Sequence, residues 1–361
     1  ETSDLTMNFG GLYSRYIGDH FGNLLWGQTI GDTQPNHRFY ESQGIKTEGS
    51  FFAKATQKLT SKLTGFLDLQ FRGIDYNVDG TVSGPQDFSV DDQFAFFNPK
   101  AGLTFMLSQK QNLYFSYAKA QREPNRTDYE NGSPKPEKLN DFELGWRMKK
   151  EKIQAQANLY WMEYQDQLVL TGAIDEVGAP IRQNVGKSRR VGIEIEATIQ
   201  LADQWLFKPN LAVSSNQNLD FYFKRDGILQ SLGKTQLAYS PNIVGGNALV
   251  YAPSTHFQVG LLSKHVGKQY MGNINSENSS LPSYFISDIN AVFSWQPKKW
   301  VKEIQWSTTI NNIFNLKYLS NGYFYTYDDD WTSPGQTTTI EGAGYYPQAG
   351  LHFLSGLKLI F

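Results

Sequence analysis

The chain of 361 residues contains no cysteine. This absence excludes a disulfide framework and metal sites built from thiolates. The sequence also lacks any run of about 18 apolar residues, so it predicts no transmembrane helix. Basic residues form no stripe and the formal net charge is -2, which argues against nucleic acid as a partner.

The motifs of common enzyme chemistry are missing as well. There is no GxSxG nucleophile elbow, no HExxH zinc motif and no glycine-rich phosphate loop before a helix. The five histidines are not spaced as metal ligands. We therefore expect no enzyme activity, no catalytic residue, no metal site and no resident cofactor.

What the sequence does have is a period of two along most of its length. Val191, Ile193 and Ile195 share one face of an extended segment, and Glu194 and Glu196 lie on the other. A period of two with one apolar face indicates a β-strand. The mean hydropathy of -0.47 is compatible with membrane-spanning strands, because only every second residue of such a strand faces lipid.

The connections between these segments alternate between short and long. Short polar turns are expected at residues 59–61, 108–111, 149–152, 201–204, 252–255 and 296–300. Long loops are expected at residues 17–44, 77–96, 122–137, 171–183, 220–236, 272–281 and 319–348. Short turns on one rim and long loops on the other are typical of outer-membrane barrels, as is a last strand that ends on Phe361. We predict an all-β fold, an antiparallel transmembrane β-barrel of about fourteen strands without helices.

Several stretches resemble elements of one family, the TonB-dependent outer-membrane receptors. Residues 311–318 (NNIFNLKY) are similar to its NLF-x-x-x-Y element, and residues 345–350 (YYPQAG) are similar to the approach to its last strand. Residues 121–124 (QREP) and 134–138 (PKPEK) resemble its FRAP and NPDLKPE hairpin. Residues 15–22 (RYIGDHFG) look like a stretch common in Bacteroidetes members.

The resemblance implies the domain organisation. Family members have an N-terminal plug domain and about 22 strands, whereas residues 1–361 contain no plug-like segment and fewer strands. We expect residues 1–361 to be one partial transmembrane β-barrel domain, the C-terminal portion of a larger barrel. The sequence begins with Glu1 rather than Met, and we expect that this is not the native start.

The resemblance also implies the function: uptake of a scarce ligand, energised by TonB, in the outer membrane of a Gram-negative bacterium. An iron–siderophore complex is the commonest cargo, and cobalamin or a glycan is an alternative. The expected partners are outer-membrane lipid, the small-molecule or metal-complex ligand, and the TonB complex through the N-terminal region. A passive fourteen-stranded channel, an outer-membrane hydrolase or adhesin, and a soluble all-β binding protein also stay open. The stretch 121–138 has no histidine, which argues against haem as the cargo.

Candidate ligand-binding residues lie in the expected long loops. Arginine can pair with an anionic ligand, and aromatic rings offer stacking surfaces. Asp328, Asp329 and Asp330 beside Trp331 could meet a cation, although a solvated loop tip is the simpler interpretation. The candidates are Arg122, Arg126, Tyr323, Tyr325, Tyr327, Asp329, Trp331 and Tyr345.

Overall fold

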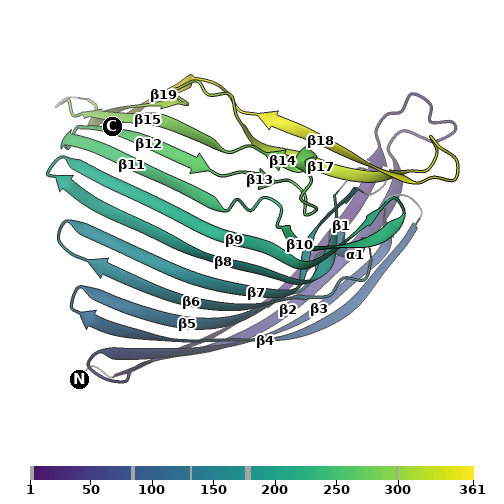
Figure 1. Cartoon of the computed structure of the whole chain (residues 1–361), viewed down its shortest axis with the longest axis horizontal. Helices are drawn as coiled ribbons and strands as arrows, with labels where there is room; N and C mark the ends of the chain where they lie inside the picture. Colours follow the sequence, from purple (N-terminus) through teal and green to yellow (C-terminus); the bar gives the residue numbers. More distant parts are fainter. Residues whose placement is uncertain (1–3, 83–85, 131, 175–179, 298–299) are drawn as a thin grey trace.

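The chain folds into one long antiparallel sheet that curves into an incomplete cylinder (Figure 1). The computed structural model describes residues 4–82, 86–130, 132–174, 180–297 and 300–361. Short turns lie along the left side of Figure 1 and the long connections along its right side. We call these two sides the short-turn rim and the long-loop rim. The predicted all-β fold and the alternation of connections are both confirmed.

Fourteen strands form the wall of the cylinder. They are β1 (Leu5–Leu24), β2 (His37–Lys58), β3 (Leu63–Val82), β4 (Gln86–Ser108), β5 (Gln111–Arg122), β6 (Glu137–Lys149), β7 (Ile153–Ile174), β8 (Pro180–Ala202), β9 (Trp205–Arg225), β11 (Ile243–Ser254), β12 (Phe257–Val266), β15 (Tyr284–Trp295), β16 (Glu303–Asn311) and β19 (His352–Ile360). Three strands of the same sheet extend the wall at the long-loop rim: β10 (Ile228–Gln236), β17 (Leu319–Asp329) and β18 (Thr338–Pro347). The remaining elements are short: β13 (Gln269–Tyr270), β14 (Ser280–Leu281), the helix α1 (Arg126–Glu130) and the 3₁₀ turn η1 (Glu277–Ser279).

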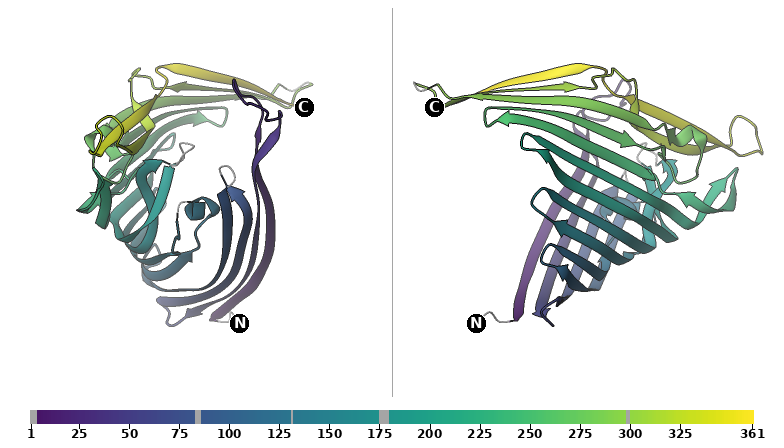
Figure 2. Two further views of the ribbon diagram at one scale, coloured as in Figure 1. Left: turned by 90° about the vertical axis from the view of Figure 1, so that its right-hand side faces the viewer. Right: turned by 60° about the vertical axis from the view of Figure 1, so that its left-hand side comes forward.

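The wall strands pair in series. Each strand from β1 to β9 pairs with the next, and the series continues through β11, β12, β15, β16 and β19 with antiparallel ladders throughout. The number of strands agrees with the prediction. Within the described ranges no ladder joins β1 to β19, so the wall is open along one seam (Figure 2).

The two faces of the wall differ in chemistry because successive residues of a strand point to opposite sides. On β19, Phe353 and Leu357 are 72% and 67% exposed, and Ile195 on β8 also remains exposed. The opposite face of β8 carries Glu194 and Glu196. An apolar surface of this extent suits lipid rather than water.

The polar face is the concave one. The helix α1 lies inside the curve of the wall in the left view of Figure 2. Its Arg126 donates from Nη2 to Oγ of Ser42 on β2 at 3.0 Å. Ser42 and the exposed, apolar Phe51 are separated by an odd number of positions along β2, so their side chains point to opposite faces of the strand. Ser42 therefore belongs to the polar face.

The stretch that carries the NIFN sequence builds the junction between β16 and β17. Asn312 is 3% exposed and has a positive φ of 52°, which asparagine tolerates better than most residues. Its side chain accepts from the Leu316 backbone N at 2.9 Å and donates to the Leu316 backbone O at 2.8 Å. Its own backbone N donates to Asp288 Oδ1 at 2.7 Å. These bonds fix the turn that follows β16 and leads into the hairpin of β17 and β18.

A buried apolar cluster holds that hairpin to the rest of the long-loop rim. It joins Phe324 of β17 to side chains from β7, β8, β9, the residue after β10 and the segment that holds β13 and β14. Its members are Val169, Val185, Phe221, Phe223, Leu237, Met271, Ile274, Leu281 and Phe324. Close packing of this kind is the main source of tertiary stability.

Several predictions about connections were wrong in detail. Residues 77–96, 220–236 and 319–348 were expected to be loops, but most of their described residues form strands: β3 and β4, β9 and β10, and β17 and β18. Strands β1, β2, β7 and β8 also run into the expected loops 17–44 and 171–183. No helix was expected, yet α1 forms one turn because Asn125 and Asp128 cap each other's backbone: Asp128 N donates to Asn125 Oδ1 at 3.1 Å, and Asn125 N donates to Asp128 Oδ2 at 2.9 Å.

In the part of the chain that the structure describes, no helix is long and apolar enough to cross a membrane.

Candidate functional site

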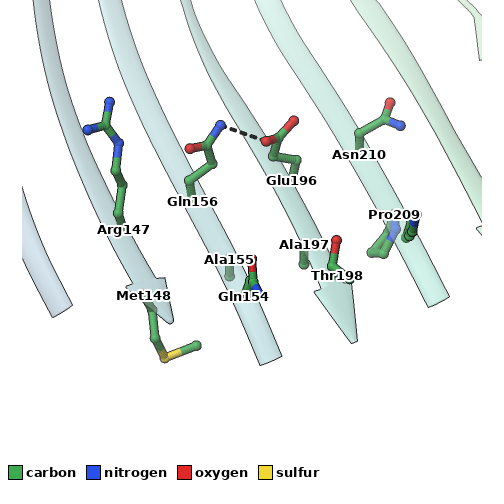
Figure 3. Close-up of a pocket in the computed structure, with 11 residues that line it drawn as sticks. Arg147, Met148, Gln154, Ala155, Gln156, Glu196, Ala197, Thr198, Pro209 and Asn210 are labelled. Atoms are coloured by element: carbon green, nitrogen blue, oxygen red, sulfur yellow. Dashed lines mark hydrogen bonds between the residues drawn. The ribbon is translucent and has the colours of Figure 1, made fainter. Parts of the chain in front are cut away.

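Polar side chains line the concave face of the wall near the short-turn rim. Figure 3 shows Arg147, Gln156, Glu196 and Asn210 projecting from four neighbouring strands, β6 to β9. Gln156 Nε2 donates to Glu196 Oε1 at 2.7 Å. The hollow that they line has a volume of about 330 Å³. It is a shallow polar surface of mixed charge and shows no preference for a ligand of one sign.

The connection between β5 and β6 folds back into the cylinder and is fixed there by charge. Glu123 forms ion pairs with Lys46 and with Arg72 Nη2, the second at 3.4 Å, and Arg72 Nε donates to Glu48 at 2.9 Å. Burial raises the pKa of Glu123, but the hydrogen bond from Lys46 and the nearby Arg72 outweigh it and hold that pKa below its ordinary value. The carboxylate therefore stays ionised and keeps the connection against the wall.

Arg126 serves the same anchoring purpose. Its guanidinium pairs with Glu130 at 2.5 Å, donates to Ser42 and stacks over the ring of Phe88 at 5.3 Å. Only 19% of its side chain is exposed. The structure therefore places this predicted ligand-binding residue in a structural set of contacts inside the cylinder.

Two adjoining hollows open on the concave face where the wall meets the long loops. They have volumes of about 400 and 360 Å³ and share Gln167, Leu168 and Arg190. We call them together the arginine hollow. Its charged and polar lining residues are Gln121, Arg122, Thr127, Glu137, Lys138, Tyr164, Gln167, Arg182, Arg190, Tyr239 and Asn273.

Positive charge predominates among the lining side chains of the arginine hollow, although Arg182 Nε also pairs with the buried Asp128 at 3.3 Å. Arg122 pairs with Glu137 at 2.6 Å, yet 62% of its side chain is exposed. The second oxygen of Glu137 is occupied by the backbone N of Leu168 at 2.7 Å. Arg190 lies over the ring of Tyr164 at 5.2 Å, and its buried Nε has no hydrogen-bond partner among the described residues. A buried donor without a partner is costly, and a ligand acceptor can satisfy it only when the Arg190 side chain shifts to expose this atom.

The other predicted residues gather on the hairpin of β17 and β18. The rings of Tyr323, Tyr325, Tyr327 and Trp331 follow one another with centroids 6.3, 6.4 and 5.9 Å apart and planes inclined by 17°, 17° and 6°. We call these four residues the aromatic platform. The intervening residues Phe324 and Thr326 point to the other face of the hairpin, where they are buried.

Asp329 and Tyr345 contribute no ring to the aromatic platform. Asp329 accepts from the backbone N of Thr332 at 3.0 Å and of Trp331 at 3.2 Å. The hydrogen bonds from Thr332 lower the pKa of Asp329, so this carboxylate stays ionised at the turn. Tyr345 lies on the opposite face of the hairpin and donates from its hydroxyl to the backbone O of Asn278 at 2.9 Å.

The structure thus divides the eight predicted residues into separate groups. Four form the aromatic platform, Arg122 lines the arginine hollow, and the other three make local structural contacts. Sequence patterns did not identify Arg182, Arg190, Tyr164 or Tyr239, which come together only through strand register and loop folding. Within the described part of the chain, no three His, Asp or Glu side chains lie close enough to hold a metal ion.

A comparison of the sequence with models of known protein families finds one matching family. Residues 2–316 match the model of the family described as "TonB dependent receptor-like, beta-barrel". No curated protein matches the chain.

Several solved structures have the same fold. The ferric-catecholate import receptor Fiu from Escherichia coli K12, in its closed form, is 15% identical with a TM-score of 0.65, over 99% of this chain and 52% of that one. The copper transporter OprC is 18% identical with a TM-score of 0.68, over 100% and 54%. The siderophore receptor PiuA from Acinetobacter baumannii is 16% identical with a TM-score of 0.65, over 99% and 54%. The chain therefore spans about half the length of the structures that it matches.

Proposed function

The chain belongs to the TonB-dependent receptor-like β-barrel family, and on this premise we propose that it is the barrel part of an outer-membrane receptor that takes up a scarce ligand with energy supplied through TonB. β-Barrels of this family are outer-membrane proteins that bind small-molecule or metal-complex ligands. The exposed apolar face supports contact with outer-membrane lipid. The polar concave face supports a route for a hydrophilic cargo.

We also propose that the fourteen strands are one portion of a larger barrel. The open seam between β1 and β19 supports this, since an edge strand with unpaired backbone groups is unfavourable in lipid. The coverage of about half of each solved relative supports it as well. Contact with TonB is then expected from a region of the receptor outside these strands.

The proposed cargo is an anionic metal complex, with an iron–siderophore complex as the leading candidate. The observation that carries this choice is the arginine hollow at the long-loop rim, where Arg122, Arg182 and Arg190 lie beside tyrosine side chains. Charge-assisted hydrogen bonds from arginine to an anionic acceptor are among the strongest polar contacts in proteins. The tyrosines add flat, amphipathic surface for a bulky organic ligand.

A passive channel and a cobalamin receptor receive less support. A passive channel of fourteen strands requires a ladder between β1 and β19, and the described residues form none. Cobalamin carries no strong negative charge that would require several arginines.

Equilibrium binding to the native protein, purified in detergent, tests the cargo proposal. Ferric catecholate and ferric citrate are the anionic probes, and cobalamin is the weakly charged comparison. We expect at least one anionic complex to bind, and Arg190→Gln to weaken it by about ten- to a hundredfold, the range of a lost hydrogen bond to a charged group.

Arg147→Gln is the matched control, because Arg147 lines the separate polar hollow near the short-turn rim. It should leave the dissociation constant within about threefold of the native value. Equal losses for the two variants, or binding of cobalamin alone, would contradict the assignment of the arginine hollow to an anionic cargo.

A further inference from the structure

The aromatic platform is unusual because its rings lie flat and side by side. The three ring pairs along it have nearly parallel planes, and neighbouring centroids are separated by about the spacing of alternate residues on one face of a strand. Three of its residues are well exposed, Tyr323 by 50%, Tyr327 by 40% and Trp331 by 65%, and Tyr325 between them is half-buried. The rings thus offer one flat surface to the surroundings.

Glycines on β18 make this arrangement possible. Gly344 is directly opposite Tyr323 in the ladder, and Gly342 is opposite Tyr325. A Cβ on Gly344 would collide with Cζ, Cε1 and Oη of Tyr323, and a Cβ on Gly342 would collide with the same atoms of Tyr325. Because the three consecutive atoms are almost equally close, each glycine lies beneath the face of a phenol ring. One face of the ring covers the backbone and the other is left free.

The aromatic platform does not face the arginine hollow. Val169 and Leu237 line that hollow and also belong to the cluster that buries Phe324. Phe324 is on the face of β17 opposite to the platform. The cluster therefore separates the two surfaces, and a cargo held in the arginine hollow cannot touch the tyrosines of the aromatic platform.

The composition of the platform restricts its partner. Tyrosine hydroxyls border flat apolar faces, which suits a ligand that is itself flat and bordered by hydroxyl groups. Asp329 and the exposed Asp330 lie at the Trp331 end, where negative charge disfavours an anionic partner. Pyranose rings match these features: they present a flat face of C–H bonds and carry hydroxyl groups at the rim, which can donate to carboxylates.

We propose that the aromatic platform is a binding surface for a neutral oligosaccharide chain, with successive sugar rings stacked on Tyr323, Tyr325, Tyr327 and Trp331. This role is separate from the proposed cargo site. The hairpin would hold a neutral glycan at the long-loop rim while the arginine hollow remains open to its own ligand.

Isothermal titration calorimetry with the native protein in detergent tests the proposal. The probes are cellohexaose, maltohexaose, xylohexaose and mannohexaose as neutral chains and hexagalacturonate as the anionic one. We expect at least one neutral hexasaccharide to bind, and hexagalacturonate to bind at least about tenfold more weakly. Trp331→Ala should weaken the neutral ligand by about two- to tenfold, as expected for the loss of one stacked ring.

Two further variants separate stacking from a general loss of structure. Gly342→Ala keeps every aromatic residue but lifts the Tyr325 ring out of the common plane, so it should also weaken binding. Tyr325→Phe keeps the flat ring and should retain most of the affinity. Tyr222→Ala, which removes a tyrosine 59% exposed on β9, is the matched control and should have no effect.

Several results would overturn the proposal. They are failure of all four neutral hexasaccharides to bind, preferential binding of hexagalacturonate, or affinity that is unchanged in both Gly342→Ala and Trp331→Ala. A concentration-dependent dimer that dissociates in Trp331→Ala and prevents glycan binding would instead assign the surface to a second copy of the chain.

Discussion

Replacing Phe324 with alanine should release the hairpin of β17 and β18 from the long-loop rim. Phe324 is 9% exposed and packs in the cluster with Met271 and Leu281. The Phe324 ring packs closely on two glycines. A Cβ placed on Gly272 would be 2.7 Å from ring atom Cδ1 and 3.1 Å from Cε1, and a Cβ placed on Gly172 would be 3.7 Å from Cε1. Truncation of a phenylalanine in such a site typically costs about 3–5 kcal/mol, through lost burial and the cavity that remains.

Because the hairpin extends beyond the wall, this loss should appear as local opening rather than unfolding of the whole barrel. Amide hydrogen exchange in residues 319–329 and 338–347 is the appropriate assay. A loss of about 3 kcal/mol corresponds to an increase of roughly a hundredfold in the opening equilibrium. Exchange in β5 and β6, which do not contribute to the cluster, should be unchanged.

Phe314→Ala provides the matched control, since Phe314 is 70% exposed and lies outside the cluster. It removes the same atoms without creating a buried cavity. If Phe324→Ala and Phe314→Ala give the same exchange rates in the hairpin, the cluster does not hold it and the packing argument is wrong.

The remaining predictions concern charge, lipid exposure and backbone strain. Burial raises the pKa of Glu341, but hydrogen bonds from Ser276 and Arg225 outweigh it and hold that pKa below its ordinary value. Its contribution to hairpin stability is therefore present near neutral pH and lost as pH falls through that lowered value. The opening equilibrium of β18, obtained from exchange rates corrected for the intrinsic pH dependence of amide exchange, should rise in acid in the native protein but not in Glu341→Gln. Leu357→Arg on the exposed apolar face of β19 should reduce folding stability in bilayers by about 2–4 kcal/mol in urea titrations, whereas Lys358→Ala on the other face should change it by less than about 1 kcal/mol. Gly80 has a φ of 135°, so Gly80→Ala should destabilise the barrel by about 1–3 kcal/mol in the same assay, and an unchanged midpoint would contradict the strained geometry.

Local pattern was sufficient to predict the wall. Alternation in segments such as residues 191–199 identifies a strand with one apolar face without any tertiary information, because the period of two is a property of the chain itself. The short turns were predicted for the same reason. The hairpin of β17 and β18 was missed because its two faces are set by a cluster drawn from five distant segments rather than by lipid.

The candidate site was predictable only in part. Tyr323, Tyr325 and Tyr327 fall on one face of any strand through residues 319–329, so their grouping follows from the sequence. That Tyr345 lies on the opposite face depends on the ladder register with β17, which the sequence does not state. The hydrogen bond between Arg126 and Ser42 joins residues 84 positions apart in the chain, so the sequence could not predict it.

The uptake of radiolabelled ferric catecholate and ferric citrate by iron-starved cells tests the central claim most directly. Cells that produce the native protein should accumulate at least one labelled complex, and the accumulation should disappear in a strain that lacks TonB. Uptake that is independent of TonB, or that is equal with and without the protein, would contradict the account.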